Sequence, residues 1–386
     1  MSRTIVDIHI LQTVPPSNIN RDDTGSPKTA VFGGTRRARV SSQAWKRATR
    51  LAFNSRLDPK ELGVRTKRIV ELLADRITAQ NPSIDSRQAQ DLAKQAFAAL
   101  GKKGIKLKKT RKSETEPLPD EAGYLVFLSG RQLDRLADAA VAANATDDPR
   151  KALKDAGLTK AIDREHSVDI ALFGRMVADV TDLNVDAAAQ VAHALSVHAV
   201  ETEFDYYTAV DDHKNLDEEE DAGAGMIGTV EFNSSTLYRY ATIDVDRLLD
   251  NLDDGQATVR AVQAFVEAFA TSMPTGKQNT FANRTLPDGV VVSVRDTQSV
   301  NLVGAFEQAV EEPARLKVAS RKLVEHAKNV DTSFGTTPVN SWVVRVGDAT
   351  SELQDLGTTV TLPELVVQVG EVVSDRLSQG TGTTES

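Results

Sequence analysis

The start of the chain alternates apolar and polar residues in the way that a half-buried β-strand does. Residues 4–11 place Val6, Ile8 and Ile10 on one face, and a repeat of two residues is the period of a strand. A Pro-Pro-Ser-Asn cluster follows, and then a long polar loop that ends in two adjacent glycines. Proline and glycine interrupt regular structure, so this region predicts one strand and a long loop.

A helical period begins after residue 40 and predicts a helix over residues 42–54. Ser41 and Ser42 are suitable capping residues at its start. The expected buried side consists of Ala44, Trp45, Ala48, Leu51 and Ala52. The cations Lys46, Arg47 and Arg50 are expected to face away from that side, as on an amphipathic surface helix.

The middle of the chain, residues 60–160, is mostly helical in pattern. The expected helices are residues 61–80, 86–100 and 132–143, with a basic linker over 101–119. Strand-like segments resume only near residues 167–173. We therefore interpret the middle region as a helical insertion.

The last part of the chain mixes both periods. Residues 191–200 fit strand and helix, and we favour strand. Further expected strands are residues 229–232, 237–243, 289–294 and 342–346, and further expected helices are residues 256–272, 302–311, 315–329 and 363–377. Strands and helices in this order, around a helical insertion, indicate an α+β fold.

Composition excludes several classes of protein. Cysteine is absent from the 386 residues, which excludes disulfides, cysteine zinc sites and thiol nucleophiles and favours a cytoplasmic protein. No apolar run reaches the roughly 18 residues of a membrane helix, so no membrane contact is expected. The N-terminus lacks the apolar stretch of a signal peptide.

Charge is unevenly distributed, although its sum is −9. Residues 24–57 contain no acid and eight basic residues, and a second basic cluster spans 102–112. Acids are densest at Asp217–Asp221. Because phosphate binding depends on local rather than net charge, this polarity favours an anionic partner on one face.

An ordered series of motifs resembles CasC, the family of Cascade backbone subunits in type I-E CRISPR systems. The motifs are NRDD at 20–23, VFGGTRRARVSSQ at 31–43, WKRA at 45–48, VDIALFGRM at 168–176, AHAL at 192–195, TAVDD at 208–212, GTVEF at 228–232, YRYA at 238–241 and KQ at 277–278. Single motifs would be weak, but the series follows the family's order over nearly the whole chain.

The resemblance implies an RRM-like (ferredoxin-like) palm, a helical fingers insertion and a thumb hairpin or loop. The implied boundaries are palm at 1–59, 166–200 and 233–377, fingers at 60–165 and thumb at 201–232. The polar residues 378–386 are separately expected to form a disordered tail. It also implies a non-catalytic subunit without cofactor or metal that polymerises along the spacer part of crRNA. The implied partners are crRNA, the target DNA strand through crRNA, further copies of itself, other Cascade subunits and a recruited nuclease-helicase.

The expected phosphate-binding residues lie mainly in the acid-free segment. They are Asn20, Arg21, Lys28, Arg36, Arg37, Arg39, Ser41, Lys46, Arg47, Arg50, Arg175 and Lys277. A basic helix face is usually just solvated. Here it follows a Gly-Gly turn whose bare backbone can approach a phosphate, and such contacts bind without reading sequence.

Four residues are expected to act on displaced bases. Met176 alone would be read as core filler, but the resemblance makes it a wedge beside an unstacked base. Tyr206 and Tyr207, where the family usually has Trp-Phe, and Ile227 flank the thumb loop, where aromatic faces can stack on any base. Adjacent tyrosines in a strand otherwise place one ring in the core and one outside.

Two alternatives remain open. Asp22 and Asp23 form the single acid pair suggestive of metal chemistry, as in a metal-dependent ribonuclease of an RNA-cleaving CRISPR effector, although an Asx turn explains them more simply. The acidic loop suggests, more weakly, a protein-interaction module. The histidines match no enzyme motif.

Overall fold

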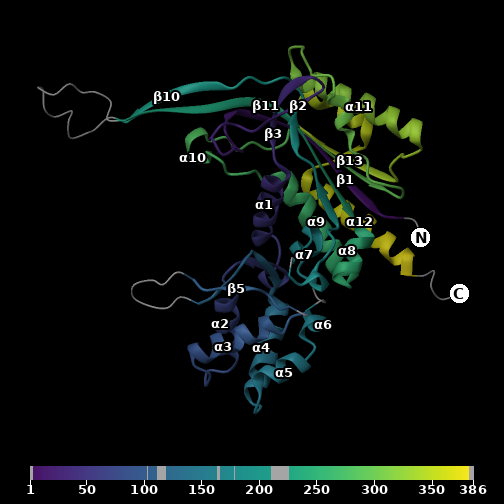
Figure 1. Ribbon diagram of the computed structural model, residues 1–386. Coiled ribbons are helices and arrows are strands. Elements are labelled where there is room, and N and C mark those ends of the chain that lie inside the picture. The colour runs from purple at the N-terminus through teal and green to yellow at the C-terminus, as the bar shows by residue number, and fades with distance from the viewer. Residues whose placement is uncertain are drawn as a thin grey trace, which may run out of the picture. The chain divides into compact units, whose positions relative to one another are not determined.

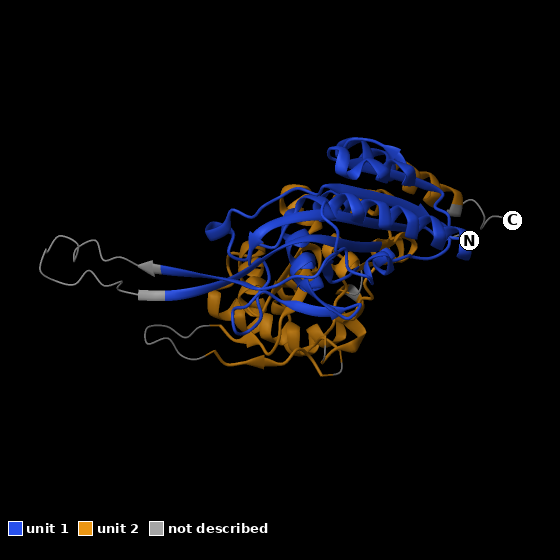
Figure 2. Cartoon of the chain, turned by 90° about the horizontal axis from the view of Figure 1, so that it is seen from above, with its two compact units in different colours: residues 1–52, 191–242, 265–369 blue, residues 53–190, 243–264, 370–386 orange. Residues whose placement is uncertain are grey.

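The computed structural model describes residues 3–101, 103–110, 119–162, 166–177, 179–209 and 226–381. The chain divides into two compact units, unit 1 of residues 1–52, 191–242 and 265–369 and unit 2 of residues 53–190, 243–264 and 370–386 (Figure 2). The acidic loop at 217–221, residues 102 and 111–112 of the second basic cluster and residues 382–386 of the tail lie outside the described residues.

Unit 1 is built on a large, mostly antiparallel sheet. Its strand order is β14-β13-β12-β1-β11-β9-β3-β2, with β10 paired to β11 (Figure 1). The strands are β1 Ile5–Ser17, β2 Thr29–Phe32, β3 Thr35–Val40, β9 Ala194–Ser196, β10 Glu203–Ala209, β11 Met226–Asp244, β12 Gly289–Arg295, β13 Asn340–Arg345 and β14 Thr358–Thr359. The helices that begin in unit 1 are α1 Ser42–Ala52, α10 Gln278–Phe281, α11 Arg315–Phe334 and α12 Leu362–Thr381.

One face of this sheet packs against α11. Tyr238 and Tyr240 of β11 join Val291 and Val343 of neighbouring strands in a core cluster that includes Leu323 of α11. Because side chains alternate along a strand, Arg239 lies on the opposite face. There it contacts the rings of α1 and of the end of α9 (Gly255–Thr271).

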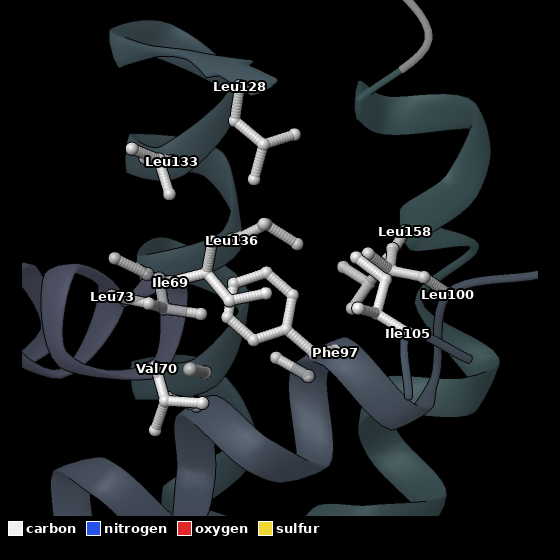
Figure 3. Packing of buried hydrophobic residues seen from close by; sticks show 14 of the residues in the cluster. Ile69, Val70, Leu73, Phe97, Leu100, Ile105, Leu128, Leu133, Leu136 and Leu158 are labelled. Atoms are coloured by element: carbon white, nitrogen blue, oxygen red, sulfur yellow. The ribbon is translucent and has the colours of Figure 1, made fainter. Parts of the chain in front are cut away.

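Unit 2 is mainly helical and has a core of its own (Figure 3). Its elements are β4 Gly63–Thr66, α2 Ile69–Gln80, α3 Ser86–Ala98, β5 Leu107–Lys108, β6 Glu121–Ala122, β7 Val126–Ser129, α4 Gly130–Asn144, α5 Pro149–Asp155, α6 Leu158–Ile162, α7 Val168–Phe173 and α8 Val245–Leu252, with β8 Ala189–Val191 at its border. Leu73, Phe97 and Leu136 bring α2, α3 and α4 together. Ser129 and Gln132 form a capping box that fixes the start of α4.

The α+β class and the sheet are confirmed, and most predicted helices are present. Residues 191–200 contain strands, as favoured. Residues 167–173 were expected to be a strand, and that expectation is wrong, because they form α7. All but one residue of α7 is buried, so the segment shows neither period, and a short apolar run does not separate strand from helix.

The boundaries of the two units differ from the expected domain limits. Residues 243–264 and 370–386 group with unit 2 rather than with the expected palm. Residues 378–381, expected to be disordered, continue α12. A helix that begins in one unit and ends in the other gives no break in the sequence pattern.

Candidate nucleic-acid interface

Hydrogen bonds of the backbone and of the Asn20 side chain bring four expected contact residues of unit 1 together. The Asn20 carbonyl accepts from the Lys28 N–H at 2.9 Å, and the Lys28 carbonyl accepts from the Arg39 N–H at 2.9 Å. The Asn20 side-chain oxygen Oδ1 accepts from the Ser41 N–H at 2.8 Å. Asn20 and Ser41 therefore shape the site, while the side chains of Lys28 and Arg39 supply its charge.

Helix α1 starts directly behind this frame. Ser41 Oγ accepts from the Ala44 N–H at 3.3 Å. Trp45 is buried beneath the helix, Arg47 is exposed, and Lys46 and Arg50 are half-buried. Burial lowers the pKa of the Lys46 ammonium, which indicates that its stem lies along the protein. The expected buried side is wrong at Leu51, which is exposed; Thr49 is buried instead.

Lys277 joins the frame through a close backbone approach. Gly276 lies against the Ile19 carbonyl, which a Cβ at residue 276 would overlap. Lys277 follows with a positive φ of 50° and precedes the short helix α10. The predicted cation from late in the sequence thus lies beside the segment that carries Asn20.

His193 belongs to this site, although the sequence analysis did not select it. The Ser42 N–H donates to His193 Nδ1 at 2.9 Å, so the neutral ring carries its proton on the exposed side at Nε2. Burial, and then the charges of Arg39 and Lys28, lower the pKa of His193. Its place in the AHAL motif was the available signal. A neutral donor beside two cations suits an anionic ligand.

Two expected contacts are contradicted by burial. Arg37 is 0% exposed, and its guanidinium donates to the carbonyls of Ser196, Phe306 and Glu307. Arg175 is 4% exposed and donates to the Leu183 carbonyl at 2.6 Å. Both cations are structural, because their donors bind carbonyl oxygens of the chain itself.

The expected role of the Gly-Gly turn is also wrong at Gly33. Gly33 and Gly34 have φ values of 58° and 76°, which suits the tight hairpin between β2 and β3. A Cβ at Gly33 would overlap the Glu307 carbonyl. The bare backbone of Gly33 thus makes room for the protein's own chain. Gly34 has nothing within 4 Å of a Cβ position.

Two further cations are exposed: Arg21, just before the acid-free segment, and Arg36 within it. Arg56, the last cation of that segment, is half-buried. Beside Arg21, Asp22 Oδ1 accepts from the Thr24 N–H at 2.9 Å and the Ser26 N–H at 3.0 Å. Hydrogen bonds from Thr24 lower the pKa of Asp22. This is the Asx turn, which favours the simpler interpretation of the acid pair. The described residues contain no cluster of three or more metal-ligating side chains.

Met176 lies in unit 2, directly after the bridge that pairs Arg175 with Val185. It is 81% exposed. The interpretation of Met176 as core filler is therefore wrong. An unbranched apolar side chain on open surface is available to a ligand, which is the condition that the wedge hypothesis requires.

Strands β10 and β11 of unit 1 extend as a two-stranded ribbon beyond the rest of the sheet (Figure 1). Tyr206 is 73% exposed and Tyr207 is 48% exposed, so the expectation of one buried ring is wrong. Tyr207 lies over Gly228 of the opposite strand. Ile227 pairs with Thr208 in the ribbon.

Phe204 is a ribbon residue that the sequence analysis missed. It is 62% exposed and shares a face with Tyr206, because the two are next-but-one neighbours along β10. The period-two spacing of the two rings was a usable signal. The ribbon thus carries rings on both faces.

Comparisons with known proteins show what the whole chain is similar to. A family model described as CT1975-like protein matches residues 6–368, whereas no curated protein matches. A chain of a solved structure described as "CRISPR RNA-guided surveillance complex, pre-nicking" is 36% identical, with a TM-score of 0.83 over 96% of this chain and 100% of that chain.

A chain of a second structure, "CRISPR RNA-guided surveillance complex", is 31% identical, with a TM-score of 0.72 over 95% of this chain and 99% of that chain. No helix among the described residues is long and apolar enough to cross a membrane. Because the family model spans nearly the whole chain, the relationship indicated by the motif series is confirmed, and this protein belongs to the CT1975-like family.

Proposed function

We propose that the chain is the guide-binding backbone subunit of a type I-E CRISPR surveillance complex. It polymerises along the spacer part of crRNA and holds the phosphates without reading bases. The observation that carries the proposal is the frame of Asn20, Lys28, Arg39 and Ser41, which gathers cations and donors at one place. The family and the two similar surveillance-complex chains support it.

In this proposal the large sheet is the RRM-like palm, the helices of unit 2 are the fingers and the β10–β11 ribbon is the thumb. Met176, Tyr206, Tyr207 and Ile227 contact displaced bases, so that target DNA pairs with the guide in segments. The protein itself is non-catalytic and acts in the cytoplasm. Other Cascade subunits complete the complex, and a separate nuclease-helicase cuts.

The direct test is co-expression with a repeat-spacer transcript. A discrete particle containing intact RNA and several copies of the chain is expected. Particles that cleave their RNA with Mg²⁺, and lose that activity in Asp22→Ala plus Asp23→Ala, would replace the proposal with the ribonuclease.

The phosphate contacts have a quantitative test. The variant with Lys46, Arg47 and Arg50 replaced by Ala should reduce the log–log slope of affinity against salt by about 0.7 for each lost single-strand contact. All RNA sequences should weaken alike. The control replaces Arg315, Lys317 and Arg321, three exposed cations of α11, and should change the slope little. A change of sequence preference would contradict backbone binding.

A further inference from the structure

The YRYA motif at 238–241 is part of the family resemblance, yet it cannot contact RNA directly, because its residues are buried. Arg239 is 1% exposed. Its guanidinium carbon lies 3.7 Å from the centre of the Trp45 ring and 4.6 Å from that of Phe269. Cation–π contacts of this kind gain strength when the cation is desolvated.

Arg239 has an unusual set of partners for a buried cation. Nη1 donates to Gln12 Oε1 at 2.7 Å, and Nη2 donates to the Phe269 carbonyl. No carboxylate among the described residues contacts it, in contrast to Arg295, which pairs with Asp7 and Asp331. Burial without an opposite charge lowers the pKa of Arg239 to about 9, so the side chain remains charged near neutrality.

Burying an uncompensated cation is costly, so its position in the fold is informative. One set of Arg239 contacts, which we call the α1 arm, reaches helix α1. Trp45, stacked on the guanidinium, lies on the buried side of the helix that carries Lys46, Arg47 and Arg50. The orientation of that helix depends on how Trp45 seats.

The other set of contacts, the Lys277 arm, reaches the loop that carries Lys277. Gln12, which accepts from Arg239, donates through Nε2 to Met273 Sδ at 3.2 Å and to the Thr285 carbonyl at 3.0 Å. Met273 and Thr285 lie on either side of Lys277 in the chain. One guanidinium thus lies between the two elements that hold the cations of α1 and Lys277.

We propose that Arg239 is a positioning residue of the guide-binding surface: it seats α1 through Trp45 and the Lys277 loop through Gln12 without touching RNA. The inference rests on the proposed function and adds a residue to it. Arginine suits this role because its planar group stacks on a ring and donates in its own plane at the same time, whereas lysine supplies only a point charge.

The test compares two buried arginines of unit 1 in the full-length protein. Arg239→Met keeps an unbranched side chain of similar length and removes the planar donor. It should lower the salt slope of RNA binding by about 1.4, equivalent to two phosphate contacts at about 0.7 each. Arg295→Met also loses a buried guanidinium, but on the α11 face, and should lower thermal stability while keeping the wild-type slope.

Two further variants separate the arms and stand in if Arg239→Met does not fold. Trp45→Phe reduces the ring area that stacks on Arg239 and should therefore lower the salt slope through the α1 arm. Gln12→Ala breaks the Lys277 arm, so Lys277→Ala should add nothing in that background, whereas removal of the α1 cations should still add its full effect.

The outcomes are distinguishable. Absence of RNA binding by the wild-type chain, alone or in co-expressed particles, overturns the proposed function. Wild-type binding together with an unchanged slope in Arg239→Met, or in both arm variants, overturns the positioning role alone. Equal slope losses in Arg239→Met and Arg295→Met would also overturn it, because the effect would then reflect general destabilisation.

Discussion

The two glycines of the β2–β3 turn allow a sharp test of the packing in unit 1. Gly33 and Gly34 both have a positive φ, so replacement of either by Ala carries a similar backbone cost of about 1–2 kcal/mol. They differ in their surroundings: a Cβ at Gly33 overlaps the Glu307 carbonyl, while one at Gly34 meets nothing within 4 Å.

The extra cost at Gly33 follows from what Glu307 does. Its carbonyl accepts from Arg37 Nη2 at 3.0 Å, so a displaced Glu307 weakens a buried hydrogen bond to a charged group, worth about 1.5–3 kcal/mol. We expect Gly33→Ala to destabilise the protein by about 2.5–5 kcal/mol in total and Gly34→Ala by only about 1–2 kcal/mol.

The assay is equilibrium unfolding in urea, followed by tryptophan fluorescence. The chain has two tryptophans, and both, Trp45 and Trp342, are buried in unit 1, so the signal reports on the unit that contains the turn. Equal costs for the two variants would refute the reasoning, since the Glu307 contact would then contribute nothing.

Three other predictions follow from burial. Burial holds the pKa of His9 at about 3, below its ordinary value, so the contribution of His9 to the unfolding free energy is complete above about pH 6.5 and decreases as the pH falls toward 3. Between pH 7 and 5, urea titrations should show a loss of about 2 kcal/mol in the unfolding free energy. His9→Gln should remove most of this pH dependence. Met176→Ala should change the unfolding free energy by less than about 0.5 kcal/mol, whereas Met273→Ala, in the core, should cost about 2–5 kcal/mol; similar values would contradict the assigned exposures. Arg37→Ala should lower the melting temperature rather than the salt slope of RNA binding. A loss of RNA affinity at an unchanged melting temperature would contradict the assignment of Arg37 as a buried structural cation.

Sequence pattern predicted the elements best where one face of a helix or strand is buried. Residues 42–54 have such a face, and the predicted helix is present as α1. Residues 4–11 form the predicted strand, but the expectation of a half-buried strand is wrong, because its polar residues Asp7 and His9 are buried as well. Residues 168–173 are buried almost on all sides, so no period survives and the strand prediction failed. Pattern also gave no sign of the division into units, since it contains no information on which distant segments pack together.

The candidate site shows the same limit for charge. Lys28 and Arg37 are equivalent in a sequence, because both are cations in an acid-free segment. Lys28 is partly exposed, whereas the guanidinium of Arg37 is buried and donates hydrogen bonds to three carbonyls of residues about 160–270 positions away. Those carbonyls have no signature in composition or spacing, since every residue has one. The motif resemblance points to this region, and only the folded structure distinguishes its surface cations from its buried ones.

The marginal stability of the β10–β11 ribbon affects how tightly a ligand can bind to it. A lone pair of strands is only marginally stable in water, and Phe204, Tyr206 and Tyr207 lie open on its two faces. Its amide hydrogens should therefore exchange with solvent long before those of β12, every residue of which is buried. A ligand that binds these rings must also order the ribbon, and the conformational entropy lost in doing so reduces the net affinity. Changes that stiffen the ribbon from within, at positions that never meet the ligand, would then tighten binding.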